Sequence, residues 1–243
     1  MKKCAVIIAA FDCAKYVREC LISVARQTSI EGWEFDIRVG VDGCENTQRA
    51  VESCTSEGIM FDMYSVEQNV GAYMMRNSLI ALRPADAYSY FDADDVMHPH
   101  YLSKVLEQID GGHNAVMTAK IQCEENMSIT DECCIQAGGA ITFTHKALES
   151  VGGFNPYRCG CDTDFMCRLE SAGINIGMLN TPLYYRRKHE RALTKSPIFG
   201  MASTYRRDVW LLMSDQRAAG IIKVSPKTVN MTHGSVSFKK RWW

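Results

Sequence analysis

A strand-like run closes on a dense group of carboxylates in the stretch Tyr88-Ser89-Tyr90-Phe91-Asp92-Ala93-Asp94-Asp95. Its aromatic residues favour a β-strand, and the aspartates follow where that strand ends. Asp92 and Asp94 project to the same side of an extended backbone, and Asp95 lies where the chain turns. Crowded carboxylates need water or a counter-charge, and a divalent cation with oxygen ligands is one such partner. A solvated acidic turn before the next helix is the alternative.

The chain before this stretch alternates between strand and helix patterns. Apolar runs predict strands at 6–8, 37–41, 60–65 and 88–91, and helical spacing predicts helices at 14–27, 47–57 and 72–82. This alternation predicts an α/β fold with a mainly parallel central sheet flanked by helices. Ligands bind such sheets outside the carboxyl ends of the strands, and two predicted strands end in acid, at Asp42 and Asp92.

The second half is less regular. Strand patterns lie at 115–120 and 141–143, and helical patterns at 162–172 and 201–218. The chain shows neither an internal repeat nor a linker rich in proline or serine. We therefore expect a single domain over residues 1–220, followed by a C-terminal extension over residues 221–243.

Composition excludes an intrinsically disordered chain, a collagen-like repeat and a disulfide miniprotein. With 47% hydrophobic and 23% charged residues, the 243-residue chain resembles an ordinary soluble protein. A formal net charge of -1 provides no bulk attraction to nucleic acid, and we expect no nucleic-acid partner. The apolar run at residues 4–11 is read as a buried strand and not as a signal peptide, because it is short and lacks a cleavage pattern.

Cysteine usage bears on the compartment. Eleven scattered cysteines are an odd number, which favours free thiols in a reducing compartment, and we expect a cytoplasmic protein. The cluster Cys159-Gly160-Cys161, with Cys167 beyond it and Cys133-Cys134 upstream, is an alternative zinc site, but no pair has the C-x-x-C spacing of common zinc knuckles.

Four stretches, in order, resemble those of the family 2 glycosyltransferases with the GT-A fold. They are the opening strand and helix at 6–12 and 16–28, the turn Val41-Asp42-Gly43-Cys44, the segment from Asn69-Val70-Gly71 through Arg76-Asn77 to the D-x-D signature at 92–95, and the segment from Val151-Gly152-Gly153-Phe154 to Cys161-Asp162. The resemblance implies a GT-A fold with a nucleotide-binding half over about residues 1–112 and an acceptor-binding half over about residues 113–220.

The resemblance also implies the site residues. Asp162 is the expected catalytic base, with Asp164 as the alternative. The residues implied to bind the nucleotide sugar are Ala10, Asp42, Arg76, Asp92 and Arg186, and those implied to bind the metal are Asp92, Asp94 and His189. Other roles remain open at this point, since Asp42 could simply end a strand, Arg76 could order the aspartates or form a structural ion pair, and His189 could lie in a solvated basic loop with Arg186.

By the same resemblance, the expected function is that of a metal-dependent, inverting glycosyltransferase. The expected cofactor is Mn²⁺ or Mg²⁺, the donor a nucleotide sugar (a UDP-sugar first), and the acceptor a glycan or another hydroxyl compound. Phe238 stands where the Gln-x-x-Arg-Trp signature of processive synthases requires glutamine, so we expect a nonprocessive enzyme.

Two other functions compete with this one. A catalytically silent sugar-binding or scaffold protein is suggested by Cys161, which replaces a family glutamate. A sugar nucleotidyltransferase would open with a glycine-rich loop, which is missing at residues 9–12. The ending Phe238-Lys239-Lys240-Arg241-Trp242-Trp243 suits weak peripheral contact with a membrane, with a flexible terminus or a subunit contact as alternatives.

Overall fold

The computed structural model describes residues 1–134 and 140–234, with only the backbone described for 131–134. Within these residues ten strands form one sheet: β1 (Lys2–Ala10), β2 (Trp33–Asp42), β3 (Asp62–Val66), β4 (Ala87–Asp92), β5 (Val96–Met97), β6 (Ala115–Cys123), β7 (Ile129–Cys134), β8 (Ile141–Thr144), β9 (Ile176–Arg187) and β10 (Thr232–His233). The helices are α1 (Val17–Ala25), α2 (Glu45–Thr55), α3 (Ala72–Ala81), α4 (Tyr101–Asp110), α5 (His145–Val151), α6 (Cys161–Ser171) and α7 (Thr204–Ala218), with a short 3-10 turn η1 (Leu193–Lys195).

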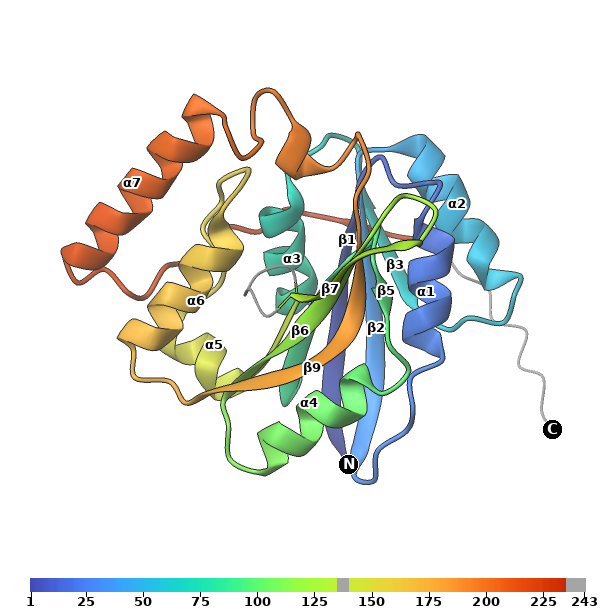
Figure 1. Ribbon diagram of the computed structural model, residues 1–243, viewed down its shortest axis with the longest axis horizontal. Coiled ribbons are helices and arrows are strands. Elements are labelled where there is room, and N and C mark those ends of the chain that lie inside the picture. The colour runs from blue at the N-terminus through green and yellow to red at the C-terminus, as the bar shows by residue number, and fades with distance from the viewer. Residues whose placement is uncertain (135–139, 235–243) are drawn as a thin grey trace.

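The sheet is parallel in its N-terminal half and mixed beyond it (Figure 1). Its strand order is β10-β3-β2-β1-β4-β8-β6-β9-β5, and β7 pairs with β6. Strands β3, β2, β1 and β4 are mutually parallel, as predicted from the alternation of strands and helices. Strand β8 enters between β4 and β6 from the opposite direction and is antiparallel to both, so the parallel pattern ends there.

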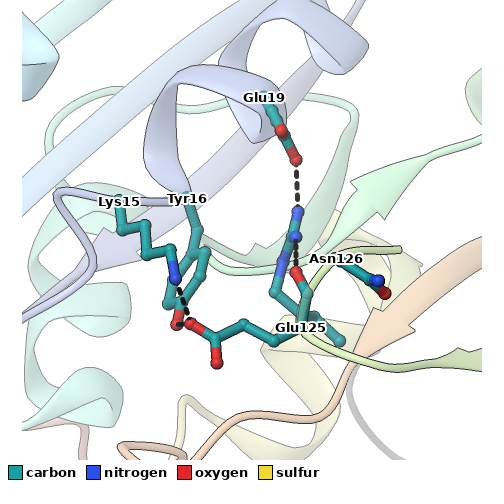
Figure 2. A pocket seen from close by; sticks show the side chains of 6 residues that line it. Lys15, Tyr16, Glu19, Glu125 and Asn126 are labelled. Atoms are coloured by element: carbon teal, nitrogen blue, oxygen red, sulfur yellow. Dashed lines mark hydrogen bonds and ion pairs between the residues drawn. The ribbon is translucent and has the colours of Figure 1, made fainter. Parts of the chain in front are cut away.

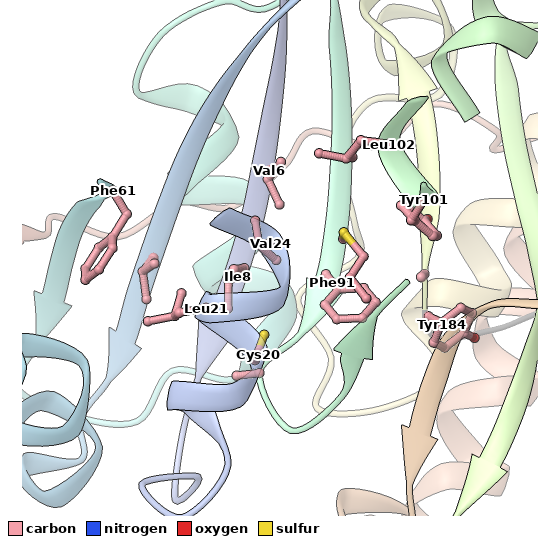
Figure 3. Packing of buried hydrophobic residues seen from close by; sticks show 14 of the residues in the cluster. Val6, Ile8, Cys20, Leu21, Val24, Phe61, Phe91, Tyr101, Leu102 and Tyr184 are labelled. Carbon is pink, nitrogen blue, oxygen red and sulfur yellow. The ribbon is translucent and has the colours of Figure 1, made fainter. Parts of the chain in front are cut away.

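Strand β1 lies at the centre of the fold because both of its faces are buried. Cys4, Val6 and Ile8 belong to the core that α1, α2 and α4 cover, and Figure 3 shows this core around Val6 and Ile8. Ala5 and Ile7 point the other way, into the core beneath α3, α5, α6 and α7. This two-sided burial explains the continuous apolar run and confirms that it is a strand. Across the described residues, no helix combines the length and apolar character needed to cross a bilayer.

Strand β9 is the main element that the sequence patterns did not predict. It runs parallel to β6, but the register shifts between Thr118, which pairs with Leu179, and Ala119, which pairs with Pro182. Two residues, Asn180 and Thr181, are therefore accommodated as an irregularity in the middle of the strand. A proline beside polar residues hides the alternation from which a strand is recognised.

Residues 221–234 run back across the domain. Val224 forms a bridge with Gly152 and donates its N–H to the Val151 carbonyl at 3.0 Å, and β10 then pairs with the edge strand β3. The predicted extension is thus packed on the fold as far as residue 234, and we propose that the domain includes this part. The predicted membrane contact at 238–243 lies outside the described residues.

The Gly152 contact can be tested by substitution. Gly152 has φ +72°, and a Cβ there would lie 1.9 Å from the Val224 carbonyl oxygen. Gly173 has a similar φ of +68° and open space around it. We expect Gly173→Ala to lower the free energy of unfolding by about 1–2 kcal/mol through backbone strain alone. Gly152→Ala should lower it by about 1–3 kcal/mol more, because backbone atoms must also move.

Urea unfolding of both variants measures this difference. Equal losses in the two variants would contradict the close packing of the segment at Val224 against α5.

Candidate active site

A pocket of about 760 Å³ opens at the carboxyl edge of the parallel strands. Ala9 of β1 pairs with Gly40 of β2 and with Asp92 of β4, so the ends of the three strands meet at one edge. The start of α3, the start of α6, the end of β9 and the segment around η1 supply the other walls. The predicted residues Asp42, Asp92, Asp94, Asp162, Arg186 and His189 all line this pocket.

The acidic cluster of the sequence is a compact triad in the structure. Asp92, Asp94 and Asp95 each place an oxygen within 4.8 Å of the others. Burial raises the pKa of Asp92 to about 6, because the lowering effect of Arg76 only partly offsets burial and Asp94 adds to the rise. Burial and the two neighbouring carboxylates likewise raise the pKa of Asp95 well above its ordinary value. The triad therefore holds more negative charge than its surroundings readily accommodate.

Arg76 contacts the triad from α3. Its guanidinium is buried, forms an ion pair with Asp92 and lies 4.3 Å from the ring centroid of Tyr90. The Tyr73 ring is 5.3 Å from it on the same helix. Of the roles considered for Arg76, ordering the aspartates matches this geometry. Contact with the nucleotide stays a prediction.

Arg187 contacts the triad from the end of β9. Its backbone N–H donates to Asp95 Oδ1 and its Nε donates to the Asp94 carbonyl, both at 2.9 Å. The guanidinium also donates to the Glu125 carbonyl and pairs with Glu19 of α1. It lies 4.9 Å from the ring centroid of Tyr16. Arg187 is thus fully engaged with protein groups. Of the neighbouring arginines 186 and 187, it is the one with a structural role.

A smaller pocket beside this arginine shows how the surrounding elements are joined (Figure 2). The carboxylate of Glu125, at the β6–β7 turn, accepts hydrogen bonds from Lys15 and from the Tyr16 hydroxyl, the latter at 2.6 Å. The same Tyr16 ring lies 4.6 Å from the ring of His189. The β6–β7 turn, α1 and the end of β9 are therefore fixed together around the acidic triad.

Asp42 organises the loop that leads into α3. Its carboxylate accepts the backbone N–H of Val70 at 2.7 Å and of Gly71 at 2.8 Å, and the Asn69 amide at 3.0 Å. Arg158, from the second half of the chain, donates to the Asn69 side chain and, at 2.9 Å, to its carbonyl. Asp42 therefore has a structural role at the pocket wall, and its contact with a nucleotide stays a prediction.

Asp162 and Asp164 have different surroundings. Asp162 lines the pocket in the first turn of α6 and accepts a hydrogen bond from the Tyr73 hydroxyl at 3.0 Å. Asp164 is buried and accepts hydrogen bonds from Asn155 at 2.9 Å, from Arg168 at 2.8 Å and from Arg217. Asp164 is thus a structural carboxylate, and Asp162 is the one of the two that faces the pocket.

The comparison with known families decides the classification. The sequence profile of glycosyl transferase family 2 matches residues 5–133, more than half of the chain. The chain belongs to this family. Among curated proteins, no sequence matches it.

Solved structures share the fold. Staphylococcus aureus TarS 1–349 in complex with UDP gives a TM-score of 0.65 at 17% identity, over 77% of this chain and 61% of that one. The complex of the same protein with UDP-GlcNAc gives 0.66 at 16%, over 79% and 60%. The mannosyltransferase PcManGT from Pyrobaculum calidifontis, in complex with GDP-Man and Mn²⁺, gives 0.66 at 14%, over 93% and 66%. The chain thus spans about three fifths of the TarS 1–349 structures, and its fold is GT-A.

For this member of family 2, the triad could hold a divalent cation. Carboxylate oxygens suit hard cations such as Mg²⁺ and Mn²⁺. His189 is buried with Nε2 at 2.8 Å from Asp94 Oδ2, and its Nδ1 has no hydrogen-bond partner within the described residues. Of the predicted ligands, Asp92 and Asp94 lie together in the triad and His189 contacts Asp94, and the structure adds Asp95 to the triad.

Of the predicted residues Ala10 and Arg186, only Arg186 lines the pocket. The side chain of Ala10 is fully buried in the core, and it is Ala9 and Phe11 that line the pocket. The difference arises because adjacent side chains of a strand point to opposite faces, and contact of Ala10 with the donor stays a prediction. Arg186 lines the pocket beside the triad, whereas Arg187 is buried.

Sequence reasoning missed many residues of the pocket wall, and four of them matter to the argument below. They are Phe11, Tyr73, Arg158 and Trp210. The exposed aromatic ring of Phe11 at a strand end was a usable signal. Tyr73 and Arg158 gave none, because each reaches the site only through the packing of the two halves of the chain.

The zinc alternative finds no support in the structure. Within the described residues, the acidic triad is the one group of potential ligands compact enough to hold a metal, and Cys159 and Cys161 are buried free thiols. Burial raises the pKa of Cys13 to about 12. Cys44 differs, because hydrogen bonds from Thr47 outweigh partial burial and lower its pKa.

The raised pKa of Asp92 predicts a pH dependence of stability. The folded state holds the proton more tightly than the unfolded state, whose pKa is near 3.8. This group therefore stabilises the folded protein below about pH 4, and that contribution is lost as the pH rises through about 6. In metal-free protein, the melting temperature of Asp92→Asn minus that of wild type should therefore increase as the pH is raised from 4 to 7.

Thermal melts at several pH values in a chelating buffer measure this difference. Asp215→Asn, on the exposed face of α7, is the control and should show no such trend. A difference between Asp92→Asn and wild type that does not vary with pH would contradict the prediction.

Proposed function

We propose that this chain is a metal-dependent, inverting glycosyltransferase that moves a sugar from a nucleoside-diphosphate sugar to a hydroxyl acceptor. The observation that carries the proposal is that Asp162 and the acidic triad line one pocket of a family 2 chain. We assign the donor to the nucleotide-binding half, about residues 1–112, and the acceptor to the second half, about residues 113–220.

The donor is a UDP- or GDP-sugar, with a UDP-sugar as first choice. Two of the structural neighbours were solved with UDP or UDP-GlcNAc, and one with GDP-Man. In this chain Phe11 exposes half of its ring at the pocket edge, where a nucleobase could stack. Arg186 lines the same pocket and its positive charge acts on Asp92, which supports a role in pairing with the diphosphate.

Asp92, Asp94 and His189 are the residues that would hold Mn²⁺ or Mg²⁺. When bound, such a cation neutralises charge on the diphosphate leaving group. Arg76 keeps the Asp92 carboxylate oriented through its ion pair, and Arg187 fixes the backbone at Asp94 and Asp95. The chain itself thus supplies a preorganised set of oxygen donors.

Asp162 is the base that takes the proton of the acceptor hydroxyl. The Tyr73 hydroxyl donates to Asp162 Oδ1 at 3.0 Å, which leaves Oδ2 to accept that proton. Burial raises the pKa of Tyr73 well above its ordinary value, so this hydroxyl stays a donor. The acceptor oxygen forms a bond to the anomeric carbon while the bond to the diphosphate oxygen breaks. One base opposite the leaving group gives direct displacement and inversion.

The competing silent scaffold loses its one sequence argument. Cys161 is fully buried in the core with Phe165, and its thiol faces the carbonyls of Tyr157 and Cys159 at 3.6 Å. The cysteine at this position therefore removes no carboxylate from the pocket wall of this chain.

Removing the carboxylate at position 162 tests the proposed base. Asp162→Asn should lower the release of nucleoside diphosphate by about 10²–10⁴-fold, because a positioned base contributes rate enhancement of that order. The assay follows UDP or GDP released from UDP-glucose, UDP-GlcNAc and GDP-mannose with Mn²⁺ present. Asp215→Asn is the control, and melting temperatures verify folding. The proposal fails if wild type releases no diphosphate from any donor.

Removing one carboxylate of the triad tests the metal. Asp94→Asn should weaken Mn²⁺ binding by at least about tenfold, since changes around a metal site commonly cost 10–100-fold in affinity. Electron paramagnetic resonance of unbound Mn²⁺ measures the affinity without any activity assay. Equal Mn²⁺ affinity in Asp94→Asn and Asp215→Asn would contradict the assignment.

A further inference from the structure

Trp210 is a pocket residue that the proposed mechanism does not use. It lies on α7 with 41% of its surface exposed, and it lines the same pocket as Asp162. Within the described residues, no group accepts a hydrogen bond from its indole Nε1. A partly exposed indole at a pocket wall offers apolar aromatic surface to whatever enters the pocket.

The position of this indole is fixed relative to Asp162. Gly160 directly precedes α6 with φ +77°, and a Cβ there would lie 3.2 Å from Cδ1 and 3.4 Å from Nε1 of Trp210. The pyrrole edge of the ring therefore lies on bare backbone two residues before Asp162. Met213, one turn further along α7, is buried beside it. Packing against Gly160 and Met213 therefore holds the indole ring near Asp162, the proposed catalytic base.

The segment that carries Trp210 holds many of the exposed apolar side chains of the described residues. Seven of the thirteen exposed large hydrophobic residues in the described chain lie between residues 193 and 221: Leu193, Ile198, Met201, Trp210, Leu211, Leu212 and Ile221. Three of these, Leu193, Met201 and Trp210, line the pocket itself. Such concentrations of exposed apolar surface mark binding sites.

Polar groups share this part of the wall. Thr163, Thr194 and Arg206 line the pocket together with Trp210. One aromatic face combined with a few hydrogen-bonding groups matches a pyranose, which has an apolar C–H face and hydroxyls around its edge. Helices α6 and α7, which carry this part of the wall, lie on the side of the molecule away from α1 and α2 (Figure 1), and the proposed nucleobase position at Phe11 belongs to a different element, the segment between β1 and α1.

We propose that the Trp210 indole is the platform on which a sugar ring of the acceptor stacks, with one ring hydroxyl directed at Asp162. This inference rests on the proposed function and narrows the acceptor to a glycan. Gly160 is then a positioning residue, because any side chain there would displace the indole from its place beside the base.

Ligand-observed saturation-transfer NMR tests the platform. The probes are the methyl glycosides of glucose, galactose, mannose and N-acetylglucosamine, each added to the full chain with UDP and Mn²⁺. For at least one probe we expect saturation on the ring C–H protons with wild type. Affinity should fall at least about tenfold in Trp210→Ala, as for loss of an aromatic stacking partner, and should be largely retained in Trp210→Phe.

Leu211→Ala is the matched control, since Leu211 is the exposed neighbour on α7 and does not line the pocket. It should bind as wild type does, and thermal melts verify that the variants fold. Absence of saturation for every glycoside, or equal affinity in Trp210→Ala and wild type, overturns the platform. If wild type binds glycosides through Trp210 but releases no diphosphate from any donor, the platform stands and the transferase proposal fails.

Discussion

Mutual repulsion among three carboxylates at the end of β4 is the constraint around which this pocket is built. Each carboxylate is offset by a different group: Arg76 pairs with Asp92, His189 contacts Asp94, and the backbone N–H of Arg187 binds Asp95. These partners come from α3 and from the end of β9 and the residues after it. Because the charges are only partly neutralised, the same constraint that shapes the scaffold leaves oxygen donors that could hold a cation.

The two halves of the chain meet through polar contacts at the pocket. Arg158 of the second half binds the Asn69 loop that Asp42 organises in the first. Tyr73 of α3 likewise reaches across to Asp162 of α6. The groups of one half are therefore held in a defined position relative to those of the other, which is what the proposed transfer between two bound molecules requires.

The sequence patterns predicted the parallel half of the sheet well, because β1, β2 and β4 carry continuous or alternating apolar residues, and β2 and β4 end in acid. They failed at β9, where Pro182 interrupts the alternation and the irregularity is absorbed only by pairing with β6. They also named Ala10, whereas it is Ala9 that lines the pocket, because that choice depends on which face of a strand is turned to the core.

Tertiary packing likewise decides the roles of residues whose local sequence is uninformative. Trp210 lies in an ordinary amphipathic helix, and its relation to Asp162 arises only because α7 packs on Gly160. The path of residues 221–234 depends in the same way on a glycine at 152 and on the free edge of β3.

The contrast between Cys44 and the buried thiols has a practical consequence. Among the described cysteines, Cys44 combines partial exposure with a lowered pKa, and the Thr47 hydroxyl that contacts its sulfur at 3.2 Å also accepts the backbone N–H of the pocket residue Cys13 at 3.1 Å. Reactivity of a thiol follows its thiolate fraction and its access. Within that set, a maleimide fluorophore should therefore attach first at Cys44. The Thr47 hydroxyl links this thiol to a residue of the pocket wall, so the emission of the fluorophore could report ligand entry in the unmutated chain.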